Sequence, residues 1–276
     1  MQITPIGSIM AARIEGVDLS QTQDNETTVA IQQALVDHGF IVFPNQHISP
    51  EQQIAFGLQF GSLNVHPHME SLEGYPEVLN ITKEPSDKAN FGGGWHTDLT
   101  FLEEPPLGSI LYAREVPPLG GDTLYANMFA AYEALSDGMK RLLDGLVAVH
   151  SASKIYAEGG VYSKDAHPAK NREVAAANAT CEHPVVRTHP ENGRKLLFVN
   201  PSFTIRFKDM RRSESEPLLK YLFAHANSPE FVYRHQWQIN DIAMWDNRST
   251  QHYALNNYQG HRREMHRVTV NGNKPF

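Results

Sequence analysis

The chain has 276 residues, 41% of them hydrophobic and 20% charged, and its formal net charge is −7. This balance is typical of a globular protein with a sizeable core, and the acidic charge, with no run of Lys or Arg longer than two, argues against a nucleic-acid or membrane-surface partner. Cys181 is the only cysteine, so no internal disulfide can form, and no stretch has the apolar length of a signal sequence or a membrane span. We therefore expect a soluble, cytoplasmic protein.

The first half of the chain is predicted to contain helices separated by short strands. Apolar residues at helical spacing before Gly39 predict a helix over 24–38. The segment SPEQ at 49–52 has the form of a capping box, which predicts a helix from there to about Phe60. Further strands are predicted over 40–43, 77–82, 107–116 and 147–151, and short helices over 127–135 and 138–146.

The second half is predicted to consist mostly of strands. Residues 156–180 are polar and irregular, and a loop of that length inside a compact domain is typical of a functional lid. Glu191-Asn192-Gly193 is a hairpin signal, and one helix is predicted over 214–226. The predicted strands cover 185–189, 195–200, 231–238, 241–245, 249–253 and 263–270. Many strands with a few long helices indicate a mainly β core with helices packed outside.

The segment GGGWHTDLTF at 92–101 contains a candidate metal pair. If it forms a strand, His96 and Asp98 point to the same face and can bind one ion together. In a chain with 14 His, however, such a pair also arises by chance, so a solvent-facing strand is the simpler alternative.

His252 and two arginines near it favour the metal interpretation. Two His and one carboxylate can form a facial triad that leaves three coordination positions open, as in non-haem Fe(II) oxygenases. His252 lies on the predicted strand at 249–253, and Arg263 and Arg267 share one face of the last strand with Met265. A planar guanidinium on such a face suits bidentate capture of a carboxylate.

Five segments together resemble the taurine dioxygenase family of Fe(II)- and 2-oxoglutarate-dependent enzymes: WHTDLTF, GGDTLYAN, HPVVRTHPENGRKLLFVN, WDNRSTQHYALNNY and HRREMHRVTVNG. The resemblance extends nearly from end to end, and the ordered set is far more specific than any one segment. It implies a double-stranded β-helix, or jelly roll, with surrounding α-helices, formed by 1–276 as a single domain. It also implies an enzyme that uses O₂ to hydroxylate a small organic anion, releases succinate and CO₂, and assembles as a homo-oligomer.

The resemblance assigns the metal and cosubstrate residues one by one. It makes His96, Asp98 and His252 the Fe(II) ligands, and Thr123 and Arg263 the residues that hold the distal carboxylate of 2-oxoglutarate. The WDNR segment matches a strand-turn signature that looks structural.

The same resemblance assigns the substrate site. His66, Arg267 and the backbone N–H of Leu99 match the groups that bind the sulfonate in the taurine enzyme, and Phe203 completes the predicted substrate-binding set. A sulfonate or sulfate ester is therefore the favoured substrate class, because all three matching groups suit an anion.

Two substitutions at the substrate site depart from the taurine enzyme. Its amine-binding Tyr and Asn are replaced by Met69 and Gly92, which offer no polar side chain. The glycines at 92–94 are predicted to form a pliant pocket wall that leaves room for a larger substrate. The alternative is a plain turn before the strand.

Three other functions remain open from the sequence. SLEGYPEV and VHSASK also resemble the phenoxypropionate branch, so a phenoxyalkanoate dioxygenase is the alternative within the family. Outside it, a zinc hydrolase could use the same His-Asp-His set, but Thr123 and Arg263 argue against it. A non-catalytic jelly-roll binding protein is the last alternative, against which the intact triad argues.

Overall fold

The computed structural model of the chain describes residues 1–66, 71–158, 160–161 and 178–276. Met69 and most of the predicted lid at 156–180 lie outside the described residues. Within the described part of the chain, no helix is long and apolar enough to cross a membrane.

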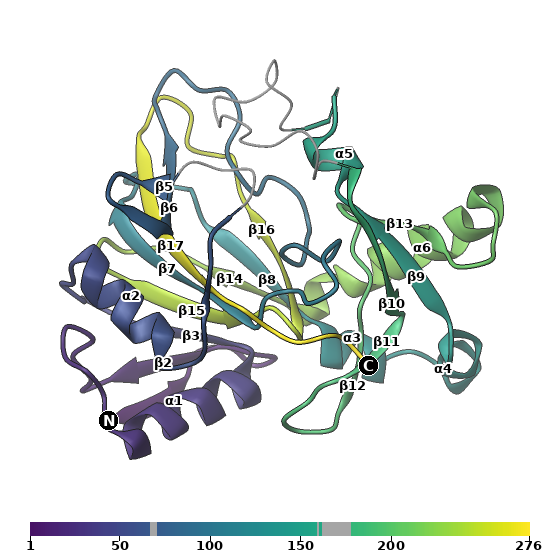
Figure 1. Cartoon of the computed structure of the whole chain (residues 1–276), viewed down its shortest axis with the longest axis horizontal. Helices are drawn as coiled ribbons and strands as arrows, with labels where there is room; N and C mark the ends of the chain where they lie inside the picture. The colour runs from purple at the N-terminus through teal and green to yellow at the C-terminus, as the bar shows by residue number, and fades with distance from the viewer. Residues whose placement is uncertain (67–70, 159, 162–177) are drawn as a thin grey trace.

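A nine-stranded sheet forms the larger layer of the fold (Figure 1). All the pairings in this sheet are antiparallel except β2 with β3. The strand order is β1 (Gln2–Pro5), β2 (Ala12–Glu15), β3 (Phe40–Phe43), β15 (Ile242–Asp246), β7 (Gly108–Glu115), β17 (Arg263–Val270), β6 (Tyr75–Lys83) and β5 (Ser71–Leu72), with β4 (Leu63–Asn64) also paired to β17.

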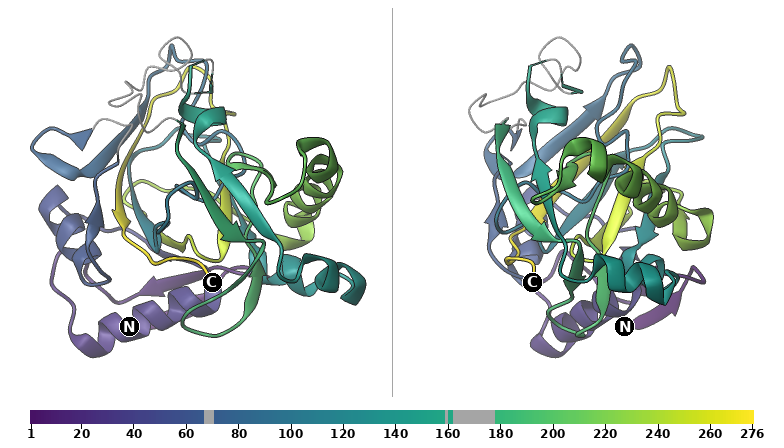
Figure 2. Two further views of the ribbon diagram at one scale, coloured as in Figure 1. Left: turned by 45° about the vertical axis from the view of Figure 1, so that its right-hand side comes forward. Right: turned by 90° about the vertical axis from the view of Figure 1, so that its right-hand side faces the viewer.

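Smaller sheets complete the β core. One has the order β14 (Val232–His235), β8 (Thr123–Asn127) and β16 (Thr250–Ala254), and another has the order β10 (Thr180–Pro184), β9 (Val147–Ser151) and β13 (Thr204–Phe207). The predicted hairpin is present as β11 (Val186–Thr188) and β12 (Lys195–Leu197). Turning the molecule brings β9, β10 and β13 forward, with α6 (Arg212–Ala226) beside them (Figure 2).

Two capped helices cover the outer face of the larger sheet. Helix α1 (Asn25–His38) begins where the Asp24 carboxylate accepts from the Thr27 N–H, and it ends at Gly39, whose φ of 68° no other residue adopts as easily. Helix α2 (Pro50–Leu58) starts with the predicted capping box. Both pack on the sheet through buried side chains such as Ile31, Leu35 and Phe56. Each such side chain contributes about 1.5–3 kcal/mol by leaving water.

Shorter helices and α6 cover the opposite side of the molecule (Figure 1). They are α3 (Met128–Glu133), α4 (Asp137–Leu143) and α5 (Ser153–Tyr156), followed along the chain by a 3₁₀ turn at Pro229–Phe231. Helices α3 and α6 share a core cluster that includes Phe129, Leu219 and Leu222. The prediction of a mainly β core with outer helices is thus confirmed.

The predicted strand through His96 and Asp98 is wrong. His96 forms only an isolated bridge with His252, and Asp98 lies in a turn. The prediction also missed several short strands, among them β2, β8 and β13. Their few residues carry too little periodicity to be recognised before their partners are known.

Candidate active site

His96, Asp98 and His252 converge at the centre of the fold. The two His residues exchange backbone hydrogen bonds, from the His96 N–H to the His252 carbonyl at 3.1 Å and in return at 2.8 Å. Asp98 Oδ1 lies 3.6 Å from His96 Nε2 and 3.9 Å from His252 Nε2. One ligand atom from each residue lies within 4.8 Å of the other two, and all three residues are buried.

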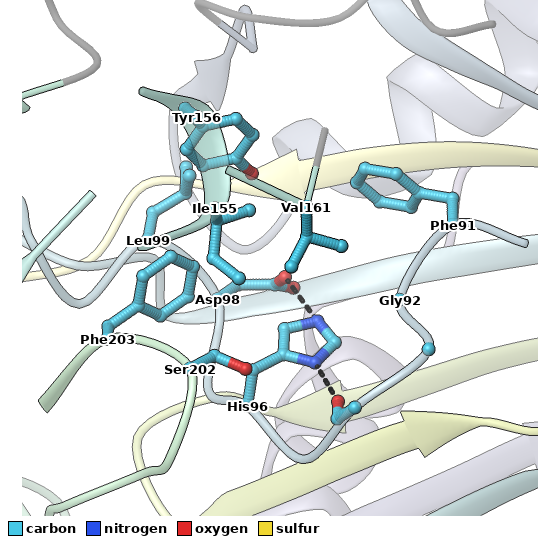
Figure 3. A pocket seen from close by; sticks show the side chains of 12 residues that line it. Phe91, Gly92, His96, Asp98, Leu99, Ile155, Tyr156, Val161, Ser202 and Phe203 are labelled. Carbon is cyan, nitrogen blue, oxygen red and sulfur yellow. Dashed lines mark hydrogen bonds and ion pairs between the residues drawn. The ribbon is translucent and has the colours of Figure 1, made fainter. Parts of the chain in front are cut away.

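The glycines before His96 set its backbone path and its tautomer. Gly92 has a φ of 77°, and its carbonyl accepts from the N–H groups of Gly94 and Ala254. The Gly94 carbonyl in turn lies 2.7 Å from His96 Nδ1 (Figure 3). Because a carbonyl only accepts, Nδ1 carries the proton and Nε2 keeps a free lone pair on the side of Asp98. The stretch 92–94 is therefore a turn that orients the His96 side chain, and it also forms part of the pocket wall.

This donor set fits a divalent metal ion. The separations between the ligand atoms are too long for hydrogen bonds, so the lone pairs face a shared point. Burial alone would raise the pKa of Asp98, but Arg267, His252 and His96 outweigh it and hold that pKa well below its usual range. Burial and the nearby His96 hold the pKa of His252 well below its usual range. Near neutral pH the site therefore offers one carboxylate and an unprotonated imidazole.

Arg263 and Thr123 lie beside the triad, in a recess that we call the arginine cavity. Arg263 on β17 is only 6% exposed, burial lowers its pKa, and no described residue accepts a hydrogen bond from its Nε. Thr123 Oγ1 accepts from the Trp237 indole N–H at 2.9 Å. A buried guanidinium without a counter-ion is costly, so the recess is built to receive an anion. Its lining comprises Ile81, Phe91, Gly92, His96, Leu111, Thr123, Tyr125, Trp245, His252, Ala254, Arg263 and Arg267.

A second recess, which we call the apolar cavity, is lined by His96 and Asp98 as well (Figure 3). Leu99, Phe203 and Gly92 all line it, as do Tyr156 and Ser202. Leu99 has a φ of 51°, which is strained for a leucine and turns the chain directly after the metal ligand. The remaining described walls are Phe91, Gly93, Gly94, Ile155 and Val161.

The two predicted anion-binding side chains, Arg267 and His66, lie at different distances from the triad. Arg267 Nη1 lies 3.4 Å from Asp98 Oδ1, and the guanidinium stacks over Phe91 at 5.6 Å. His66 is buried and meets Tyr156 edge to face at 6.2 Å, but it lines neither cavity among the described residues. Arg267 thus lies directly at the triad, whereas His66 lies beside Tyr156, which lines the apolar cavity.

Sequence reasoning missed Asn247, whose side chain hydrogen-bonds to the backbone of the candidate metal ligand Asp98. Its Oδ1 accepts from the Asp98 N–H at 2.7 Å, and its Nδ2 donates to the Asp98 carbonyl at 3.1 Å. The neighbouring Asp246 carboxylate is held by Arg248 and His189. The WDNR segment indicated a structural turn at this position, but the sequence showed neither the partner of Asn247 nor its role.

The chain is similar to known dioxygenases along nearly all of its length. The family model described as taurine catabolism dioxygenase TauD, TfdA family, matches residues 2–269. An alpha-ketoglutarate-dependent sulfate ester dioxygenase from Pseudomonas putida is 37% identical over 280 residues, covering 100% of this chain and 91% of that protein. An (S)-phenoxypropionate/alpha-ketoglutarate-dioxygenase from Sphingobium herbicidovorans is 32% identical, covering 91% and 88%.

A solved structure agrees with these matches. The crystal structure of a taurine dioxygenase from Burkholderia xenovorans superposes with a TM-score of 0.82 at 34% identity, covering 99% of this chain and 90% of that one.

Proposed function

The chain belongs to the taurine catabolism dioxygenase TauD, TfdA family, and from this premise we propose that it oxidises alkyl sulfate esters. It is a 2-oxoglutarate-dependent dioxygenase that uses Fe(II) and O₂ on a small-molecule substrate. The zinc hydrolase and the binding protein are therefore set aside. The proposal concerns the residue roles and the substrate class.

His96, Asp98 and His252 would hold the iron, and Arg263 with Thr123 would hold the distal carboxylate of 2-oxoglutarate. When bound, Fe(II) and 2-oxoglutarate supply the oxidising power, with succinate and CO₂ released. The chain itself keeps the His96 lone pair aimed at the metal through Gly94, and it excludes water from a buried site.

The substrate would place its anionic head near Arg267 and its hydrocarbon tail in the apolar cavity. Oxidation at the carbon that bears the sulfate oxygen replaces a C–H bond with C–OH. The resulting hemiacetal ester then breaks its C–OSO₃ bond and loses the hydroxyl proton, giving an aldehyde and sulfate. This assignment puts the scissile C–H bond between the anion site and the tail, close to the triad.

The observation that carries this proposal is the contact between the two cavities. His96 and Gly92 line both, so an anion read by Arg267 and an alkyl chain beside Leu99 and Phe203 can meet one metal ion. The higher identity to the sulfate ester enzyme than to the phenoxypropionate enzyme supports the same choice.

A substrate panel tests the proposal. Purified protein with Fe(II), 2-oxoglutarate and O₂ is assayed for succinate and for aldehyde with hexyl sulfate, hexane-1-sulfonate and 2-phenoxypropionate, and His252→Ala serves as the inactive control. Hexyl sulfate should give the largest kcat/KM and stoichiometric sulfate. A tenfold preference for 2-phenoxypropionate would replace the proposed substrate by the phenoxyalkanoate alternative.

We also propose that the chain assembles as a homo-oligomer. The family resemblance supports this, and light scattering of the purified protein would test it.

A further inference from the structure

Two turns that line the apolar cavity are joined by a buried polar network. One carries Leu99, directly after Asp98, and the other carries Phe203, and the two side chains belong to one hydrophobic cluster. Behind them, out of the cavity, are four polar side chains that are at most 1% exposed: Thr100, His150, Asn200 and Thr204. None of the four lines either cavity, so their hydrogen bonds hold the cavity-lining turns and do not contact a ligand.

Asn200 is the residue that joins the two turns. Its Oδ1 accepts from the Phe203 N–H at 2.9 Å, which fixes the turn carrying that ring. Its Nδ2 donates to Thr100 Oγ1 at 3.2 Å, one residue beyond Leu99. Its own N–H donates to Thr204 Oγ1 at 2.9 Å. A single side chain thus connects the turn of Phe203 to the turn of Leu99.

His150 closes the network from β9. Its Nδ1 is hydrogen-bonded to Thr100 Oγ1 at 2.9 Å, and it lies 3.4 Å from Thr204 Oγ1. The next residue on the strand, Ser151, donates its N–H to the Phe203 carbonyl at 2.8 Å. Thr100 Oγ1 is therefore hydrogen-bonded to both Asn200 and His150.

The strained backbone of Leu99 explains why such a support is needed. A leucine at a φ of 51° relaxes toward the ordinary region unless its neighbours hold it there. Thr100 is the adjacent residue, and its side chain is anchored to a different segment 100 positions away. Directional hydrogen bonds in a buried network fix geometry more tightly than apolar packing, which tolerates sliding.

We propose that Thr100 and Asn200 are positioning residues that determine substrate specificity by fixing the separation of Leu99 and Phe203. Loss of their hydrogen bond lets the turns of Leu99 and Phe203 shift relative to each other, so the cavity accepts bulkier tails and holds a straight tail less precisely. The inference rests on the proposed alkyl substrate, because the tail is the part of the substrate that these two side chains would contact.

Two substitutions at Thr100 test it. Thr100→Val keeps the shape and removes the hydroxyl, and Thr100→Ser keeps the hydroxyl. Each is assayed with hexyl sulfate and 2-ethylhexyl sulfate, together with the 2-oxoglutarate consumed per aldehyde formed. For Thr100→Val we expect the kcat/KM ratio of straight to branched substrate to fall at least fivefold and 2-oxoglutarate consumption per product to rise, while Thr100→Ser stays within twofold of the wild type. Affinities for Mn(II) and 2-oxoglutarate should not change in either variant.

A purely structural role predicts something different. Thr100→Val would then lower the melting temperature while the substrate ratio and the coupling stayed constant, which overturns the inference. If Thr100→Val does not fold, Asn200→Ser removes the same link from the other side and is judged by the same ratio. If the wild type turns over no sulfate ester, the proposed function has failed, and the ratio is measured with straight and branched forms of whichever anion it does oxidise.

Discussion

The side-chain amide of Asn247 is paired with the main chain of Asp98 on both sides of the same residue. It accepts from the Asp98 N–H at 2.7 Å and donates to the Asp98 carbonyl at 3.1 Å, and it also donates to the Pro106 carbonyl at 3.2 Å. The carboxylate that faces the two histidines therefore projects from a backbone with little freedom to rotate.

Removal of this amide should weaken metal binding. In Asn247→Ala the Asp98 peptide loses two buried partners, and outer partners of metal ligands are typically worth 10–100-fold in affinity. We expect the dissociation constant for Mn(II), measured by anaerobic titration, to rise by at least tenfold. Asn192→Ala, in the exposed hairpin turn, is the matched control and should leave it unchanged. An unaltered Mn(II) affinity in Asn247→Ala would show that the pairing is dispensable for the site.

Arg263→Met should separate cosubstrate binding from metal binding. Loss of one partner of a desolvated charge pair costs about 2–5 kcal/mol, so 2-oxoglutarate affinity should fall at least tenfold while Mn(II) affinity persists. Without 2-oxoglutarate the variant should be no less stable than the wild type, because the substitution removes a buried cation that has no ion pair with a described carboxylate.

Its control is Arg262→Met, one residue earlier. Arg262 pairs at the surface with Glu84, Glu115 and Glu264, so this variant should keep the 2-oxoglutarate affinity. Equal losses in the two variants would assign Arg263 a structural role instead.

The sequence could predict these arginines more easily than the triad. Strand alternation alone puts Arg263 and Arg267 on one face, and the caps at Asp24 and Gly39 fix α1. Those signals are local. The metal ligands were expected on a strand, yet the turn through Asp98 depends on a bridge to His252. No local pattern encodes that bridge.

The same reason hides Asn247, whose partner Asp98 is 149 residues away. A polar residue after a strand is usually a turn residue, and only the folded chain shows what it contacts. The family resemblance identified the three candidate metal ligands because members of a family share a whole set of site residues. It did not identify the residues that hydrogen-bond to those ligands.

Buried His150 should make the fold sensitive to acid. Burial lowers the pKa of His150 to about 3, against 6.5 for a free imidazole. Between these values the unfolded chain binds the proton and the folded chain does not, so the free energy of unfolding should fall as pH drops from 6.5 to 3, by at most about 1.4 kcal/mol per pH unit. Urea unfolding of His150→Gln should show a shallower pH slope than the wild type. Ser151→Ala, on the same strand, should keep the wild-type slope, and identical slopes in all three proteins would contradict the prediction.

Taurine should be a poor substrate compared with propane-1-sulfonate, which has a methyl group in place of the ammonium. The described walls of the apolar cavity contain no carboxylate other than Asp98, which already faces Arg267 and the two histidines. An ammonium entering there loses water without gaining a carboxylate of its own. We expect kcat/KM for propane-1-sulfonate to exceed that for taurine by at least tenfold. If taurine is equal or better, another residue binds the amine.

The bridge between His96 and His252 also sets the order in which the protein can mature. The two histidines are separated by 252 − 96 = 156 positions, so this contact closes a long loop and can form only after the whole intervening chain has been synthesised. During synthesis the ribosome releases His96 and Asp98 long before His252, and a growing chain at that stage has only two of the three ligands. Binding of one ion by all three side chains consequently has to follow synthesis of the last strands.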